Sequence, residues 1–169
     1  MVYYELMEAK DIVELYKLFK ENNIEVWIDG GWGIDALLGS QTRQHSDLDI
    51  AIERKNVEKL RSLLSSLGYQ DKEKEGSTEW NFVLANDCKE IDIHVFEFDD
   101  KKKNVYGIEY PKESLTGTGT ISGQIVKCIS PEYVIKFHEN YEPKEKDFKD
   151  IKALCDKFRL DLTKNYKKS

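Results

Sequence analysis

The chain has 169 residues, which is about the length of one compact domain and excludes two large ones. Hydrophobic residues make up 40% of it and aromatic residues 11%, so it can bury a sizeable core and wholesale disorder is excluded. The net charge of −6 is spread over both halves without a basic patch, which argues against a nucleic-acid partner. An acidic protein of this kind suits a cationic small-molecule substrate.

The cysteines and the apolar runs indicate the compartment. Cys88, Cys128 and Cys155 form no CxxC pair, which predicts reduced, buried thiols and neither a disulfide framework nor a zinc site. No run approaches the roughly 18 apolar residues that a membrane span requires. We therefore expect a cytoplasmic protein with no membrane partner, either a monomer or a homodimer.

The first part of the chain alternates between helical and strand periods of hydrophobic residues. The predicted elements are a helix over 9–22, a strand over 24–29, a helix over 31–39, a strand over 47–52 and a helix over 56–68. Gly39 suits the end of the second helix because glycine enters the left-handed region without penalty.

The second part predicts several strands and then two helices. Ser130 is expected to cap the first of these helices, with Pro131 at its first position. The predicted elements are strands over 69–75, 79–85 and 90–98, a long irregular segment with short strands over 99–123, a strand over 124–129, and helices over 131–141 and 144–158. Within the irregular segment, the Gly-Thr stretch 116–123 is read either as a mobile loop or as successive turns.

This order predicts an α+β fold, a mixed β-sheet with flanking helices and a C-terminal helical pair. We expect a catalytic domain over 1–128 and a C-terminal helical extension over 129–169 packed on it.

The strongest chemical signal is the pair Asp47 and Asp49 on one predicted strand. Alternation places both carboxylates on one face and the apolar Leu48, Ile50 and Ile52 on the other. Two such charges about 4 Å apart repel by roughly 4 kcal/mol at an effective dielectric near 20. Magnesium would relieve this repulsion and bind a nucleotide triphosphate. The alternative for an isolated Asp-x-Asp is a solvated strand end.

A third carboxylate is available on the strand 90–98, where Glu90, Asp92 and His94 share a face. Two-metal phosphoryl transfer uses about three carboxylates from neighbouring strands, so Asp92 is a candidate for the same site. The alternative is an acidic residue on the solvated face of a hairpin.

Gly30 and Gly31 end a strand and open a helix, where backbone N–H groups can hold a phosphate. The alternative is a simple tight turn. Arg43 and His45, just before the acidic pair, are candidates to contact the triphosphate or to orient a carboxylate. The alternative is that they are ordinary solvated residues of a loop. The sequence has no GxxxxGK[ST], which excludes a P-loop.

The segment WIDGGWGIDALLGSQTRQHSDLDIAI, residues 27–52, resembles the antibiotic nucleotidyltransferases of the polymerase-β-like superfamily. In that superfamily a Gly-Gly or Gly-Ser turn precedes an Asp-hydrophobic-Asp strand and a third Asp. The stretches EIDIH and CISPEYVIKFHENYEPKEKDFKDIKAL are similar to small lincosamide and aminoglycoside 2″-nucleotidyltransferases, so the resemblance spans most of residues 24–155. One departure is the 15 residues between Gly31 and Asp47, more than in many superfamily members.

The resemblance implies roles for the residues that match it. Gly30 and Gly31 would hold the nucleotide phosphates, Asp47 and Asp49 would bind magnesium, and Asp92 would be a metal ligand or the base. It also implies that a lysine of the last helix reaches the triphosphate. The candidates are Lys146 and Lys149, whose alternative role is on a solvated face.

The implied reaction transfers a nucleoside monophosphate, AMP from ATP, to a hydroxyl of an antibiotic, with magnesium as the cofactor. Since the protein is acidic, we expect an aminoglycoside first and a lincosamide second. His138 and Tyr141 either line the acceptor pocket or pack under the last helix. The candidate recognition carboxylates are Glu97, Asp99, Asp100 and Glu109.

Two other functions remain open at this point. One is a non-catalytic nucleotidyltransferase-like protein, acting as a nucleotide sensor or a toxin–antitoxin partner, against which the intact acidic triad argues. The other is a metal-dependent phosphatase or nuclease, which the absence of HD or DExK-like clusters disfavours.

Overall fold

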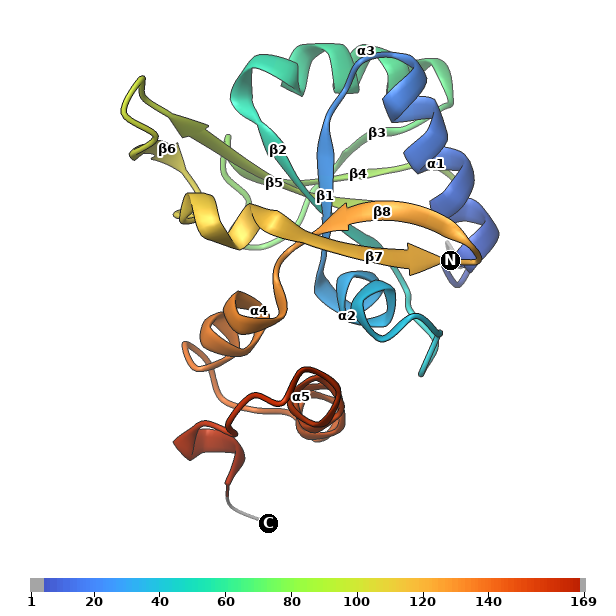
Figure 1. Ribbon diagram of the computed structural model, residues 1–169. Helices are drawn as coiled ribbons and strands as arrows, with labels where there is room; N and C mark the ends of the chain where they lie inside the picture. The colour runs from blue at the N-terminus through green and yellow to red at the C-terminus, as the bar shows by residue number, and fades with distance from the viewer. Residues whose placement is uncertain (1–4, 168–169) are drawn as a thin grey trace.

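The computed structural model describes residues 5–167, and its centre is a mixed sheet of eight strands (Figure 1). The strands are β1 Val26–Asp29, β2 Leu48–Glu53, β3 Gln70–Lys72, β4 Asn81–Ala85, β5 Glu90–Phe98, β6 Asn104–Gly107, β7 Gly117–Ile121 and β8 Gln124–Cys128. Seven of them run in the order β3-β4-β5-β2-β1-β8-β7, and β6 pairs with β5. β1 is antiparallel to β2, and β2 is parallel to β5, which confirms the mixed sheet of the predicted α+β class.

The helices flank this sheet. They are α1 Ala9–Glu21, α2 Gly30–Leu38, α3 Val57–Ser66, α4 Pro131–His138 and α5 Glu145–Phe158, with 3-10 turns η1 Arg54–Asn56, η2 Lys112–Thr116 and η3 Lys164–Tyr166. Figure 1 shows α1 and α3 at the top and α2, α4 and α5 below. α5 packs against both α2 and α4, so the C-terminal helical pair lies against the helix that follows β1. None of the helices in the described residues is long and apolar enough to cross a membrane.

Helix α2 is fixed at both ends. At its start, the Asp29 carboxylate accepts a hydrogen bond of 2.8 Å from the Gly30 N–H. At its end, Gly39 adopts the left-handed conformation predicted for it, with φ of 78°. Lys157 of α5 donates to the carbonyls of Leu37 and Leu38 at 2.8 and 3.0 Å, which satisfies acceptors that every helix end leaves open. The start of α2 is therefore held in place beside the end of β1.

The segment 99–123 is more regular than its sequence suggests. It contains β6, η2 and β7, and the Gly-Thr stretch forms β7, which pairs along its length with β8. Both predictions for this stretch, a mobile loop and successive turns, are therefore wrong. A Cβ at Gly119 would overlap the backbone of Ala36, so this glycine allows β7 to pack closely on α2.

Smaller details also differ from prediction. Ser130 occupies the cap position of α4 without a side-chain cap hydrogen bond, and its carbonyl accepts from the Val134 N–H at 2.9 Å. α4 ends at His138, and β1 starts at Val26. All three cysteines are free, but Cys88 is exposed, against the prediction of three buried thiols.

Candidate functional site

Three aspartates, Asp29, Asp49 and Asp92, form a row across the centre of the sheet, which we call the carboxylate row. In the antiparallel pair β1–β2, Asp29 is the partner of Asp49, and in the parallel pair β2–β5, Asp49 is the partner of Asp92. Residues paired in this way lie about 5 Å apart with their side chains on one face. Leu48 and Ile50, their neighbours on β2, are buried in the core, which confirms the predicted alternation of this strand.

The imidazole of His94 lies among these three carboxylates. Its Nε2 is 3.3 Å from Asp92 Oδ1 and 3.9 Å from Asp49 Oδ1, and its Nδ1 is 3.5 Å from Asp29 Oδ2. The Tyr110 hydroxyl donates to Asp29 Oδ2 at 2.6 Å and lies 3.2 Å from His94 Nδ1. In its protonated form, the His94 ring therefore supplies positive charge at the centre of the carboxylate row.

The close packing of His94 and the carboxylate row raises the pKa of some of these groups and lowers that of others. Burial alone would lower the pKa of His94, but Asp29, Asp92 and Asp49 outweigh burial and raise this pKa to about 10. Burial, together with the charges of Asp47, Asp29 and Asp92, raises the pKa of Asp49 to about 7 even though His94 opposes the shift. The pKa of Asp92 stays below its ordinary value, because contacts with His94 and Lys74 outweigh the effect of burial. The row thus holds more negative charge than a single imidazolium balances.

The arrangement fits a divalent cation. Asp49, Asp92 and His94 each offer one ligand atom, His94 only once its imidazolium has lost a proton, and these atoms all lie within 4.8 Å of one another. Asp92 is only 6% exposed, and its Oδ1 has no hydrogen-bond partner among the described residues, so a lone pair remains for a ligand. Carboxylate oxygens are the donors that magnesium prefers. Asp47, predicted to share the metal, lies outside this group and lines a neighbouring cleft.

The glycine turn adjoins the carboxylate row. Gly30 has φ of 57°, and a Cβ there would overlap the Asp49 carboxylate. A Cβ at Gly31 would overlap the His45 ring, 2.6 Å from Cε1, and the Arg43 guanidinium, 2.7 Å from Nη2. The structure therefore brings both predicted phosphate-binding glycines, at the start of α2, next to the predicted metal ligand Asp49.

We expect Gly30→Ala to lower the free energy of unfolding more than Gly68→Ala does. Both glycines have positive φ, so alanine costs roughly 1–2 kcal/mol of backbone strain at either site. Only at Gly30 must the new methyl group also displace Asp49, because no atom of residues 5–167 lies within 4 Å of a Cβ at Gly68. Urea unfolding of the two variants measures the difference, and equal losses would contradict the close packing of Gly30 on Asp49.

Arg43 and His45 are held by protein carboxylates behind the glycine turn. His45 is 4% exposed, and its Nε2 lies 2.5 Å from Asp35 Oδ2. The Arg43 guanidinium lies 3.1 Å from His45 Nδ1 and donates to Asp150 Oδ2 of α5 at 3.2 Å. These contacts tie the loop before β2 to α5 and support Gly31 from behind.

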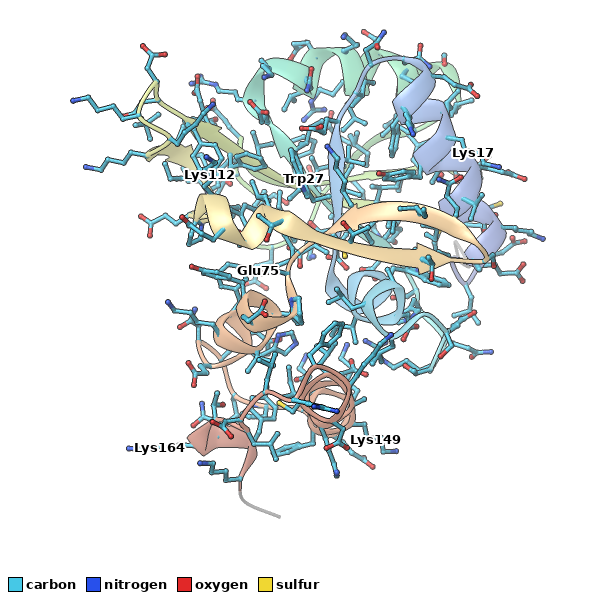
Figure 2. All side chains as sticks on the ribbon, viewed as in Figure 1. Lys17, Trp27, Glu75, Lys112, Lys149 and Lys164 are labelled. Atoms are coloured by element: carbon cyan, nitrogen blue, oxygen red, sulfur yellow. The ribbon has the colours of Figure 1, made fainter. Side chains whose placement is uncertain are left out.

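The two lysines expected to reach the triphosphate lie on the outside of α5. Lys146 and Lys149 are exposed, whereas Asp147 and Asp150 of the same helix are buried. Figure 2 shows Lys149 on the outer side of this helix. The structure does not bring either lysine to the carboxylate row, and neither lines the cavity beside it.

A cavity of about 620 Å³ opens beside the carboxylate row. Asp29, Asp49 and His94 are among the residues that line it. The rest of its lining, mostly apolar or aromatic, comes from Gly30, Asn81, Ile108, Glu109, Tyr110, Val134, Phe137, His138, Asn140 and Tyr141. Both residues proposed for an acceptor pocket, His138 and Tyr141, are among them.

Of the four carboxylates predicted to recognise the substrate, Glu109 lines this cavity. Glu97 instead pairs with Arg54 at 3.1 Å, and Asp99 accepts hydrogen bonds from backbone N–H groups of its own turn. Asp100 is exposed in the same turn. The cavity is thus less acidic than the composition of this segment suggests.

Sequence reasoning gave no role to Asp29, Lys74 or Tyr110. Asp29 had a signal, since it directly precedes Gly30 and alternates with the buried Ile28 on a strand next to β2. Tyr110 lies in the patternless segment 99–123, where no local signal links it to Asp29.

Comparisons with known proteins identify the family of this chain. The profile of the Aminoglycoside-2''-adenylyltransferase family matches residues 11–154. The chain is 29% identical over 150 residues to a lincosamide resistance protein of Staphylococcus haemolyticus, covering 86% of this chain and 92% of that protein. It is 28% identical over 134 residues to a 2''-aminoglycoside nucleotidyltransferase of Escherichia coli, covering 76% and 73%.

Solved structures share the fold. The lincomycin-bound lincosamide antibiotic adenylyltransferase LnuA has a TM-score of 0.76 and 25% identity, covering 89% of this chain and 98% of that one. ANT(2")-Ia in complex with adenylyl-2"-tobramycin has a TM-score of 0.72 and 23% identity, covering 89% and 88%. The family profile covers most of the chain, and the carboxylate row and glycine turn lie within the matched residues. The chain therefore belongs to the aminoglycoside-2''-adenylyltransferase family and is a nucleotidyltransferase.

Proposed function

We propose that this protein transfers AMP from ATP to a hydroxyl group of a lincosamide or aminoglycoside antibiotic, with magnesium as the cofactor, and thereby confers resistance. The observation that carries the proposal is the carboxylate row of three neighbouring strands, which adjoins the glycine turn and opens, together with Gly30, onto a cavity large enough for a drug-sized molecule.

Each part of the site has a role in this reaction. The start of α2, at Gly30 and Gly31, holds the phosphates. Asp49 and Asp92 hold the metal, and Asp47 joins them from the neighbouring cleft when the metal binds. When bound, magnesium offsets phosphate charge and lowers the pKa of the acceptor hydroxyl. The acceptor oxygen forms a bond to the α-phosphorus, the bond from that phosphorus to pyrophosphate breaks, and Asp92 takes the hydroxyl proton. Most of the catalysis is then positioning and charge stabilisation.

The cavity favours a lincosamide as the acceptor. Its wall carries Ile108, Val134, Phe137 and Tyr141. Among the lining residues that the structure describes, Glu109 is the one carboxylate outside the carboxylate row. An aminoglycoside carries several ammonium groups and few apolar parts, so it would need more carboxylates than this wall offers. A lincosamide combines one amine with apolar groups, which suits the wall better. This reverses the order that net charge alone suggested.

Mass spectrometry of the drug tests the proposal directly. The purified protein is incubated with magnesium, each nucleoside triphosphate in turn, and either lincomycin or tobramycin. We expect lincomycin to gain one AMP with ATP, at a higher rate than tobramycin does. Modification of tobramycin alone would restore the aminoglycoside as the acceptor. The absence of any product with either drug and all four nucleotides would favour the non-catalytic alternative.

A further inference from the structure

We propose that Lys74, between β3 and β4, binds the nucleotide triphosphate and gives up its ion pair with Asp92 to do so. The inference rests on the proposed function, since it takes a magnesium–nucleotide complex as the ligand. It replaces the lysines of α5 as the source of positive charge for the phosphates.

Lys74 reaches the carboxylate row from the solvent side. Its Nζ donates to Asp92 Oδ2 at 2.6 Å, while the other oxygen of this carboxylate faces His94. The Lys74 side chain is 55% exposed, and that of Asp92 is only 9% exposed. A half-exposed lysine on a flexible four-carbon stem can change partners at low cost, whereas the buried aspartate stays in place.

A cleft of about 270 Å³ lies beside this contact. It is lined by Asp47, Lys72, Glu73, Lys74, Val83, Glu90 and Asp92. Asp92 therefore lines this cleft, while Asp49, its partner across the strands, lines the larger cavity near α4. The larger cavity thus adjoins Asp29 and Asp49 of the row, and the smaller cleft adjoins Asp92. Lys74 and Asp47 both line the smaller cleft.

The other basic side chains near the site either pair with a carboxylate of the protein or face solvent. Arg43 is bonded to Asp150, and Lys72 is paired with Glu90. Lys146 and Lys149 lie on the exposed face of α5. A triphosphate keeps negative charge even with one magnesium ion bound, and a lysine ammonium is a common partner for phosphate oxygens. Lys74 lies beside Asp92 and can supply this positive charge to the phosphate oxygens.

The exchange predicts opposite effects on two ligands. Without nucleotide, the Lys74 ammonium competes with a metal ion for the charge of Asp92. With nucleotide, a metal bound to Asp92 withdraws that charge, and the phosphate oxygens become the better partner for the ammonium. A purely structural lysine would not produce this pair of opposite effects.

Calorimetry on Lys74→Gln tests the proposal, with Mn²⁺ alone as one ligand and magnesium–ATP without acceptor as the other. We expect Mn²⁺ to bind several-fold more tightly than to the wild type, because its competitor is gone. We expect magnesium–ATP to bind roughly 10- to 100-fold more weakly, as befits the loss of one charge-assisted hydrogen bond. Lys74→Arg keeps the positive charge and should restore most of the nucleotide affinity.

Lys72→Gln is the matched control, since it removes a lysine from the same cleft whose partner is Glu90. It should leave both affinities close to those of the wild type. Equal binding of magnesium–ATP by Lys74→Gln and the wild type would overturn the role of Lys74 while leaving the proposed function intact. An equal loss in Lys72→Gln would overturn it too, because the effect would then belong to the total charge of the cleft. A wild type that binds no magnesium–ATP would overturn the proposed function and this inference together.

Discussion

Asparagine in place of Asp49 is expected to abolish nucleotidyl transfer while the protein remains folded. Asp49 is the middle member of the carboxylate row, in register with Asp29 on one side and Asp92 on the other. The amide has the same shape but no charge, so it removes a metal ligand without opening a cavity. We expect turnover to fall by at least about 10³-fold, since a bound metal contributes several kcal/mol of charge stabilisation in the transition state. Product formation followed by mass spectrometry measures the loss.

Thermal unfolding of the same Asp49 variant provides the control for folding. Because the pKa of Asp49 is raised from 3.8 to about 7, its ionisation destabilises the metal-free fold as the pH rises through that range. Asparagine cannot ionise, so the variant should melt higher than the wild type at pH 8, with the difference shrinking towards pH 4. Asp156→Asn, an exposed aspartate of α5 paired with Lys152, should change neither turnover nor this pH profile. Near-wild-type turnover of the Asp49 variant at saturating magnesium would refute the metal assignment.

Strand alternation is enough to predict two of the three aspartates of the carboxylate row, Asp49 and Asp92. The period of two places Asp49 opposite Leu48 and Ile50, and the same rule puts Asp92 and His94 on one face of β5. The rule acts within one strand and does not reveal which strands are neighbours. Asp29 precedes the glycine turn in the sequence, but its place beside Asp49 depends on the β1–β2 register and does not follow from its own strand.

The lysines of α5 show why the rest of the site was not predictable. Lys146 and Lys149 are three residues apart, and so are Asp147 and Asp150, so the helical period alone cannot say which pair faces inward. The pair that faces inward is set by a contact at the start of the helix and by a contact with a distant loop. Asp147 accepts from the Lys144 N–H at the start of the helix, and Asp150 pairs with Arg43 from a loop more than 100 positions earlier. Lys74, which follows β3, likewise meets Asp92 only because β3 pairs with β4 and β4 pairs with β5.

Asparagine in place of Asp92 is expected to lower turnover by roughly 10²- to 10⁴-fold, the range typical for loss of a general base. The pKa of Asp92 is held below its ordinary value by His94 and Lys74 against the effect of burial, so the carboxylate is ionised and able to accept a proton at neutral pH. Because Asp92 is also proposed to hold the metal, the magnesium dependence should shift as well, whereas lower turnover with unchanged magnesium dependence and ATP affinity would leave Asp92 as the base alone. Glu90→Gln is the control, because Glu90 shares this face of β5 but pairs with Lys72. Unchanged turnover and unchanged magnesium dependence would remove Asp92 from the reaction, and a loss in the Glu90 variant would then identify Glu90 as the third carboxylate.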